Sequence, residues 1–383
     1  MSLQPDRGFR RRGSGLSRSF AIAGMVLLTA CTNPQRAQEP AIDPDAARAA
    51  IARSIPARAG NRDGWAIDIF AAFEALELRP TPENICAVIA VTEQESTFQV
   101  NPPVPGLPAI AQREIDSRAK RYSIPSVMVK AALAIESPTG ATYGERLDTV
   151  KTEKGLSDIF TDFIGMVPLG ARLFGSLNPV HTGGPMQVSI AFAEEHAQRK
   201  RYPYPLPGSV RNEIFTRRGG MYFGIAHLLD YPASYDDMLY RFADFNAGHY
   251  ASRNVALQSA VSTLSKTPLA LDGDLLRHGR GANEPSNTEL AIRKIAGRLE
   301  LNEAQIRSDL ELGDRQAFER TKLYERVFAL ADKGRQRPVP RAMMPTIRLE
   351  SPKITRKLTT EWFARRVDER YEKCLARNAA ESP

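Results

Sequence analysis

Apolar residues between positions 64 and 92 recur every three or four residues, which is the spacing of an amphipathic helix. The segment GWAIDIFAAFEALEL and the segment TPENICAVIAVTEQES each carry such a stripe. The second segment begins with Thr81 at a helix cap and Pro82 in the first turn, where these residues are favoured. The pattern predicts two packed helices, whose apolar faces carry Trp65, Ile69, Phe73 and Leu76 in the first and Ile85, Val88, Ile89 and Thr92 in the second.

The same periodicity extends along most of the chain and indicates a mainly α protein. It predicts helices after a cap at Asp43, over about 110–135 with a break at Pro125, over 189–199 and from Met221 to Leu229. Ser234 and Asp237 have the spacing of a capping box that would open a further helix. Beyond residue 266 the predicted helices are charged and amphipathic, and no region is rich in strand patterns.

The first thirty residues have the pattern of a targeting segment. A run of arginines precedes the apolar stretch FAIAGMVLL, which is too short to span a bilayer, and LTAC ends at Cys31. This arrangement resembles the lipobox of bacterial lipoproteins, which implies cleavage before Cys31 and acylation of its thiol and new amine. By analogy, Thr32 after the cysteine favours the periplasmic face of the outer membrane. An ordinary signal peptide or a buried N-terminal helix are the alternatives.

The net charge indicates which binding partners to expect, and the cysteines indicate whether a disulfide is possible. The formal net charge is +8, and the segment before Cys31 carries five arginines and one aspartate, so the remaining chain has a net charge of about +4. A mild positive balance suits an anionic polymer, while nucleic acid is not accessible in the periplasm, so no nucleic-acid partner is expected. Cys86 and Cys374 form either a disulfide or two buried free thiols.

Three separated stretches carry candidate chemistry: EQESTFQVNP, GGPMQVS and FADFNAGHYASR. In this order they resemble the lysozyme-like lytic transglycosylases of the soluble-lytic and goose-type lysozyme superfamily, over roughly residues 64–264. The chain departs from that family in three places. An insert over 101–182 separates the first two stretches, Pro185 replaces a leucine, and Phe245 replaces a tyrosine.

Helix geometry selects one glutamate of the first stretch. Residues two apart on a helix point about 200° from each other, so Glu93 and Glu95 lie on opposite flanks. Glu95 stands in the last turn, where the helix dipole and apolar surroundings favour a protonated carboxyl group. The alternative interpretation is that Glu95 is only a polar, solvated residue at the end of the helix. The resemblance implies that Glu95 is the sole acid and base, which protonates the glycosidic oxygen and then deprotonates the C6 hydroxyl to give a 1,6-anhydro end.

By resemblance, the substrate-binding residues are Ser96, Met186, Gln187, Phe245 and Asn246. For Met186 and Phe245, core packing is the alternative. The scattered histidines and the absence of a Gly-rich phosphate loop predict neither a metal nor a cofactor. The expected partners are peptidoglycan glycan strands and, through Cys31, the outer-membrane lipid, and the chain is expected to be a monomer.

Competing interpretations concern other motifs and other functions. Glu136 in AIES is a second Glu-Ser after an amphipathic helix, but no aromatic residue or Asn-Pro follows it. The triads SLN and HTG are typical of penicillin-binding proteins, in which many tens of residues lie between them. Only two residues separate them in this chain, which excludes that family. A hydrolytic muramidase and a non-catalytic glycan-binding lipoprotein remain open. The predicted organisation is a signal peptide (1–30), a tether (31–60), a lysozyme-like domain (61–266) and a helical accessory region (267–383).

Overall fold

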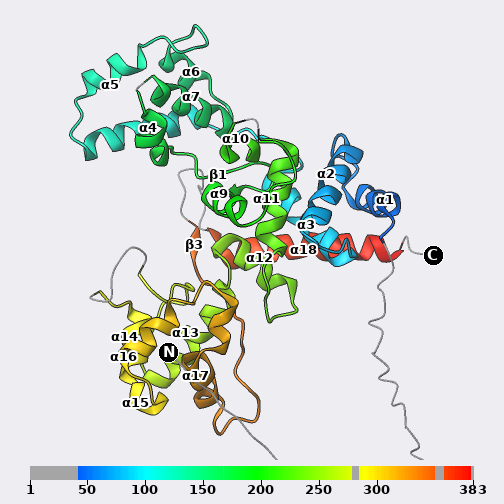
Figure 1. Ribbon diagram of the computed structural model, residues 1–383, viewed down its shortest axis with the longest axis vertical. Helices are drawn as coiled ribbons and strands as arrows, with labels where there is room; N and C mark the ends of the chain where they lie inside the picture. Colours follow the sequence, from blue (N-terminus) through cyan, green and yellow to red (C-terminus); the bar gives the residue numbers. More distant parts are fainter. Residues whose placement is uncertain (1–41, 167, 207, 278–283, 350–357, 381–383) are drawn as a thin grey trace, which may run out of the picture. The chain divides into compact units, whose positions relative to one another are not determined.

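The computed structural model describes residues 42–166, 168–206, 208–277, 284–349 and 358–380, which are mainly helical (Figure 1). The prediction of a mainly α fold is confirmed. Residues from Asp43 onward form one compact unit. The predicted signal peptide, Cys31 and most of the predicted tether lie outside the described residues.

The first and third helices begin where the sequence predicted, and the second begins two residues before the predicted segment. They are α1 (Pro44–Ser54), α2 (Arg62–Ala75) and α3 (Pro82–Ser96). The Asp43 side chain caps α1 by accepting from the amide of Asp45, and Thr81 caps α3 by accepting from the amide of Asn84. The predicted face of α2 is buried, with all four of its apolar residues at most 3% exposed.

The insert between the first two motif stretches is a group of short helices. They are α4 (Leu107–Arg121), α5 (Ser126–Leu133), α6 (Tyr143–Thr149), α7 (Glu153–Gly165), α8 (Gly170–Phe174) and the 3-10 turn η1 (Gly175–Leu177). Pro125 breaks the chain between α4 and α5, as predicted. Glu136 does not end a helix, however. Helix α5 stops at Leu133, and Glu136 is exposed in a bridge to Thr142.

The remaining elements include two short antiparallel hairpins among further helices. The first hairpin pairs β1 (Thr182–Gly183) with β2 (Val188–Ser189), and the second pairs β3 (Arg348–Leu349) with β4 (Leu358–Thr359). The helices that follow the first hairpin are α9 (Ile190–Arg199), α10 (Val210–Ile214), α11 (Arg217–Leu229), α12 (Met238–Ala247) and α13 (Ala251–Ser265). The later ones are α14 (Asn287–Lys294), α15 (Ala296–Leu299), α16 (Glu303–Leu310), η2 (Gln316–Arg320), α17 (Lys322–Asp332) and α18 (Thr360–Ala380).

The predicted capping box before α12 is wrong in one respect. Asp237 is itself the N-cap and accepts from the amide of Leu239 at 2.9 Å. The Ser234 hydroxyl instead donates to Glu319, which lies far along the chain. The sequence was compatible with a helix that starts at Ser234 or at Asp237. The helix starts at the later residue, and Ser234 makes a contact with a distant part of the chain instead.

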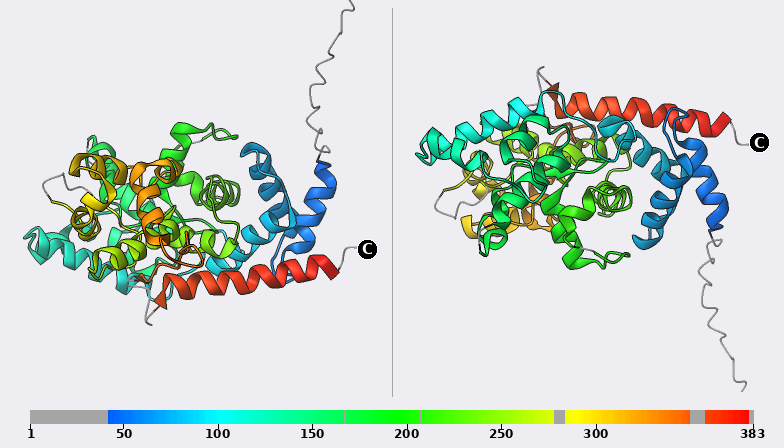
Figure 2. Two further views of the ribbon diagram at one scale, coloured as in Figure 1. Left: turned by 90° about the horizontal axis from the view of Figure 1, so that it is seen from below. Right: turned by 90° about the horizontal axis from the view of Figure 1, so that it is seen from above.

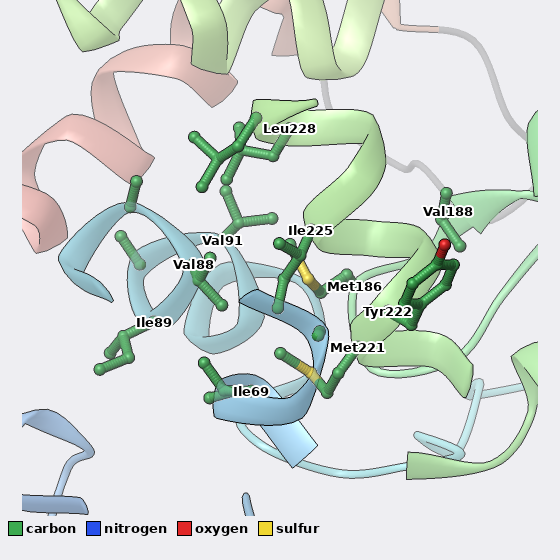
Figure 3. Packing of buried hydrophobic residues seen from close by; sticks show 14 of the residues in the cluster. Ile69, Val88, Ile89, Val91, Met186, Val188, Met221, Tyr222, Ile225 and Leu228 are labelled. Carbon is green, nitrogen blue, oxygen red and sulfur yellow. The ribbon is translucent and has the colours of Figure 1, made fainter. Parts of the chain in front are cut away.

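Two hydrophobic cores organise these helices. The first gathers buried residues of α1, α2, α3, α11, α12 and α18. Figure 3 shows the part of this core that is formed by α2, α3, α11 and the first hairpin. The second gathers residues of α13, α14, α16 and α17. Helix α18, from the C-terminal part predicted to be an accessory region, packs in the first core.

Helix α18 lies alongside α3 and is joined to it covalently (Figures 1 and 2). Its buried stripe includes Phe363, Ala364, Val367 and Tyr371. The Sγ atoms of Cys86 and Cys374 form a disulfide. Of the two alternatives that the sequence left open, the described structure contains the disulfide, which closes a loop across most of the chain.

Breaking this disulfide by reduction is expected to lower the free energy of unfolding by about 2–5 kcal/mol, because the unfolded chain gains conformational freedom. Urea unfolding with and without dithiothreitol measures the change. The double variant Cys86→Ala/Cys374→Ala is the control and should not respond to reductant. Equal midpoints for oxidised and reduced wild type would contradict the role given to the disulfide.

Candidate functional site

Glu95 stands in the last turn of α3. It is half-buried, and it is followed by Thr97 and Phe98, which have left-handed φ values of 52° and 61°. The Phe98 ring packs edge-on against Trp65 at 5.4 Å between centroids. The Ser96 side chain is buried and donates to the carbonyl of Thr92 within the helix. Ser96 therefore supports the end of the helix from inside, and its hydroxyl is not presented to a ligand in this conformation.

Glu93 and Glu95 lie on different sides of α3. Glu93 forms an ion pair with Arg58. Thr92, which precedes Glu95 by three positions and so lies about 60° from it around the helix, has its Oγ1 atom 3.9 Å from the sulfur of Met221 in α11. Glu95 thus lies toward α11, while Glu93 lies on the flank that faces Arg58 and α18.

The second motif stretch forms the turn between β1 and β2. Gln187 has a left-handed φ of 50°, and its amide donates to the carbonyl of Gly184 at 3.1 Å. Its side chain folds back over the same turn, accepting from Thr182 Oγ1 and donating to the Gly184 carbonyl, each at 3.2 Å. The half-buried Gln187 side chain is therefore held in one position at the surface of the turn.

This turn sits directly on the backbone of α11 at two glycines. A Cβ atom on Gly220 would lie 2.3 Å from Cδ of Pro185, and one on Gly224 would lie 2.5 Å from Sδ of Met186. Met186 is completely buried and packs beside Met221 and Ile225 (Figure 3). Of the two roles open for Met186, the structure shows core packing, and contact with a sugar would require it to move.

The first two motif stretches meet at Phe215, in the junction between α10 and α11. The Asn101 side-chain amide donates to the Phe215 carbonyl at 3.2 Å. The Phe215 ring covers Gly183, where an added Cβ would lie 2.5 Å from Cε1. The insert over 101–182 therefore leaves and returns at the same place, which explains how such a long segment fits between the motifs without separating them.

The third motif stretch ends α12 and also contacts α11. Phe245 is 8% exposed, its ring centroid lies 5.0 Å from that of His227, and its carbonyl accepts from His227 Nε2 at 3.2 Å. The Asn246 Oδ1 atom accepts from Thr360 Oγ1 at the start of α18. Phe245 is thus mostly a packing residue, whereas Asn246 is half-buried and near the surface.

Asp244, which the sequence reasoning missed, holds this stretch in place. It is completely buried and accepts hydrogen bonds from the amides of Tyr250 and Ser252 and from the Tyr231 hydroxyl, at 2.8–3.1 Å. Burial raises the pKa of Asp244 to about 7 despite these donors. The signal in the sequence was an aspartate placed just before the Asn-Ala-Gly turn.

Three histidines that are scattered in sequence lie together beside this stretch. The rings of His227 and His249 stack at 4.6 Å, His249 stacks on Tyr231 at 4.0 Å, and His196 joins through Phe192. Burial lowers the pKa of His227 to about 3, so the imidazole is neutral. Within the described residues, no group of three or more histidine, cysteine or acidic side chains could hold a metal ion.

A cleft of about 460 Å³ lies between the end of α3 and α18. It is lined by Glu93, Gln94, Thr97, Trp362, Arg366 and Arg370. Glu95 and the predicted substrate-binding residues are not in this lining. The cleft therefore adjoins the candidate site on the flank of α3 that carries Glu93.

The sequence profile of a family described as "Protein of unknown function (DUF1615)" matches residues 58–377. The chain belongs to the DUF1615 family. It is 53% identical over 361 residues to the protein of Escherichia coli (strain K12) described as "Uncharacterized protein YaiW", covering 93% of this chain and 97% of that protein. No solved structure matches the chain.

The DUF1615 match includes all three motif stretches, both disulfide cysteines and the cleft. The segments that pack on α11, and helix α18, which packs against α3, therefore lie largely within the part of the chain that the family profile matches. Among the described residues of this DUF1615 protein, no helix is both long and apolar enough to cross a bilayer.

Adding a methyl group at Gly224 should destabilise the protein by about 1–3 kcal/mol, because Met186 fills that space. Gly297 in α15 is the matched control, since it is helical and an added Cβ meets nothing within 4 Å. Gly297→Ala should stabilise by up to about 1 kcal/mol through helix propensity. Denaturant unfolding of both variants measures this, and equal effects would show that the turn does not need the glycine.

Asp244 should make the protein more stable in mild acid. Because its folded pKa of about 7 exceeds the ordinary value of 3.8, its contribution is fully present below about pH 4 and is lost as the pH rises through 7. Asp244→Asn should flatten this dependence between pH 5 and 8 and lower the free energy of unfolding by about 1–3 kcal/mol, because Asn cannot accept from every donor. Thermal unfolding across pH measures both effects; an unchanged slope in the variant would contradict the assignment.

Proposed function

We propose that this protein is a peptidoglycan lytic transglycosylase in which Glu95 is the only acid and base. It cleaves the bond between N-acetylmuramic acid and N-acetylglucosamine and leaves a 1,6-anhydro end. It acts at the periplasmic face of the outer membrane, where acylated Cys31 anchors it. The proposal combines the resemblance of the three motif stretches with their arrangement in the fold.

The observation that carries the proposal is the convergence of these stretches on α11. Met221, the fifth residue of α11, contacts the turn of α3 that precedes Glu95, while Gly220 and Gly224 receive the Pro185–Gln187 turn. His227 contacts Phe245, about 9 Å further along the helix axis than Met221. Three segments that span more than 150 positions of sequence are therefore supported by one buried helix, which is the arrangement that a single binding groove needs.

Neighbouring carboxylates support a mechanism with one acid rather than two. Glu213 is 3% exposed and accepts from Tyr202 and Arg218, each at 2.7 Å. Asp68 is paired with Arg217, and Glu93 with Arg58. A carboxylate held by a cation is a poor general acid, because the cation favours its ionised form. Glu213, Asp68 and Glu93 are therefore not expected to supply a second acid beside Glu95.

The chemistry requires Glu95 first to give a proton and then to take one. Protonation of the glycosidic oxygen releases the leaving sugar, and the substrate's own acetamido group stabilises the positive charge that develops at the anomeric carbon. The resulting carboxylate then accepts the proton of the C6 hydroxyl, whose oxygen attacks that carbon.

One set of observations favours a second candidate, a glycan-binding protein without catalysis. Ser96, Met186 and Phe245 are at most 8% exposed, so direct contacts with a glycan are left mainly to Gln187 and Asn246. A hydrolytic muramidase on the same fold differs only in using water in place of the C6 hydroxyl.

Glu95→Gln is expected to reduce solubilisation of purified sacculi by at least about 100-fold, because the amide cannot donate a proton as an acid does. The assay uses residues 43–383, which form one compact unit. Glu136→Gln is the matched control and should be fully active, since Glu136 lies outside any helix and is exposed. Activity that survives Glu95→Gln would remove Glu95 from the mechanism.

A further inference from the structure

The cleft between α3 and α18 continues into a basic groove along α18. A second hollow of about 210 Å³ shares Glu93, Arg366 and Arg370 with the first. It extends the lining by Glu369, Lys373 and Arg377. The views in Figures 1 and 2 show α3 and α18 side by side along this stretch. We name the two hollows together the α18 groove.

The basic residues of the α18 groove recur on one flank of the helix. Arg366, Arg370, Lys373 and Arg377 are spaced by four, three and four residues, so they form a row beside the buried stripe. Trp362 begins the same row and is 40% exposed at the wider end of the groove. The row therefore offers cations and one aromatic face to the same occupant.

The carboxylates in the groove neutralise only part of this charge. Glu93 pairs with Arg58, and Glu369 pairs with Arg366 at 2.8 Å. Arg370 and Arg377 donate to the carbonyls of Arg366 and Ser54, which carry no net charge. Lys373 is exposed and forms no ion pair with any described residue. Three cations of the groove, Arg370, Lys373 and Arg377, thus form no ion pair with a carboxylate of the described chain.

Arg370 carries a more specific sign of a missing acceptor. Its Nε atom is buried and has no hydrogen-bond partner among the described residues. An unsatisfied buried donor is costly, and an arginine donor most often satisfies a carboxylate or phosphate oxygen. The groove therefore has the chemistry of an oxyanion site in which both charge and a donor are available.

The groove also adjoins the end of α3 that carries Glu95. Gln94 and Thr97 line the groove and flank Glu95 in the chain. An occupant that contacts them lies within about one helical turn of the proposed acid. In peptidoglycan, the group attached next to the cleaved bond is the stem peptide, which carries several carboxylates and an amine.

We infer that the α18 groove binds the carboxylates of the peptidoglycan stem peptide and so selects strands that still carry peptides. Arg370, Lys373 and Arg377 bind carboxylates, Trp362 packs on the aliphatic part of the peptide, and Glu93 and Glu369 accept from its amine. A peptide with both signs of charge suits this lining better than a surface of phosphates, which the two glutamates would repel. The choice of ligand rests on the proposed function.

Calorimetric titration of the Glu95→Gln protein with a free stem tetrapeptide tests binding separately from cleavage. Lys373→Gln and Arg370→Gln should each weaken binding by at least 5-fold, and amidation of the peptide carboxylates should abolish it. Arg365→Gln is the matched control, because Arg365 is exposed away from the groove and pairs with Glu361 at 2.8 Å. It should bind as the parent does. Circular dichroism checks that the half-buried Arg370 variant is folded, and exposed Lys373 gives the second variant.

The outcomes separate this inference from the proposed function. Peptide binding that depends on Lys373 supports the groove even if sacculi are not cleaved, which would count only against the transglycosylase. Cleavage of peptide-free strands as fast as intact ones, without peptide binding, would overturn the groove and leave the enzyme standing. Binding of inorganic phosphate or of phosphatidylglycerol vesicles, but not of the peptide, would also overturn it.

Discussion

The backbone of α11 comes within van der Waals contact of the Pro185–Met186 turn, and the candidate site depends on that contact. Any side chain on Gly220 or Gly224 would occupy the space that Pro185 and Met186 fill. Ten of the thirteen residues of α11 are buried, so the helix is a fixed centre to which other segments attach. The ends of α3 and α12 meet its side chains, and the turn meets its glycines. Three segments are thereby positioned by one element.

The second constraint on the structure is the packing of α18, the last helix, against α3. The Cys86–Cys374 disulfide and the buried stripe of α18 join the last helix to the helix that ends in Glu95. This packing creates the α18 groove, which neither helix has alone. A segment that the sequence presented as an accessory region is thus part of the surface around the candidate acid.

Local features of the fold were predictable because local physics sets them. Asp43 and Thr81 cap their helices through side-chain bonds to amides two and three residues on, and the α2 stripe is buried as its spacing required. Features set by distant contacts were not predictable, or were left open between alternatives as the disulfide was. Ser234 bonds Glu319, Cys86 pairs with Cys374, and α18 packs in the first core.

The candidate site was predictable only in part. Helix geometry alone separated Glu93 from Glu95. In the structure Glu93 pairs with Arg58, and Thr92, in the turn before Glu95, contacts Met221 of α11. The sequence left Met186 open between substrate binding and core packing and could not decide, because its burial depends on a glycine 38 positions later in the sequence. The role of Asp244 was hidden for the same reason, since its partners come from a turn that sequence patterns do not specify.

The mass of the muropeptides released from purified sacculi tests the central claim most directly, because it reports how the glycosidic bond is broken. A single acid that deprotonates the C6 hydroxyl leaves muramic acid ends that are lighter by one water than the ends left by hydrolysis. We predict that every new end produced by the wild-type protein is of this anhydro kind. Reducing ends, or no released muropeptides from a folded protein, would contradict it.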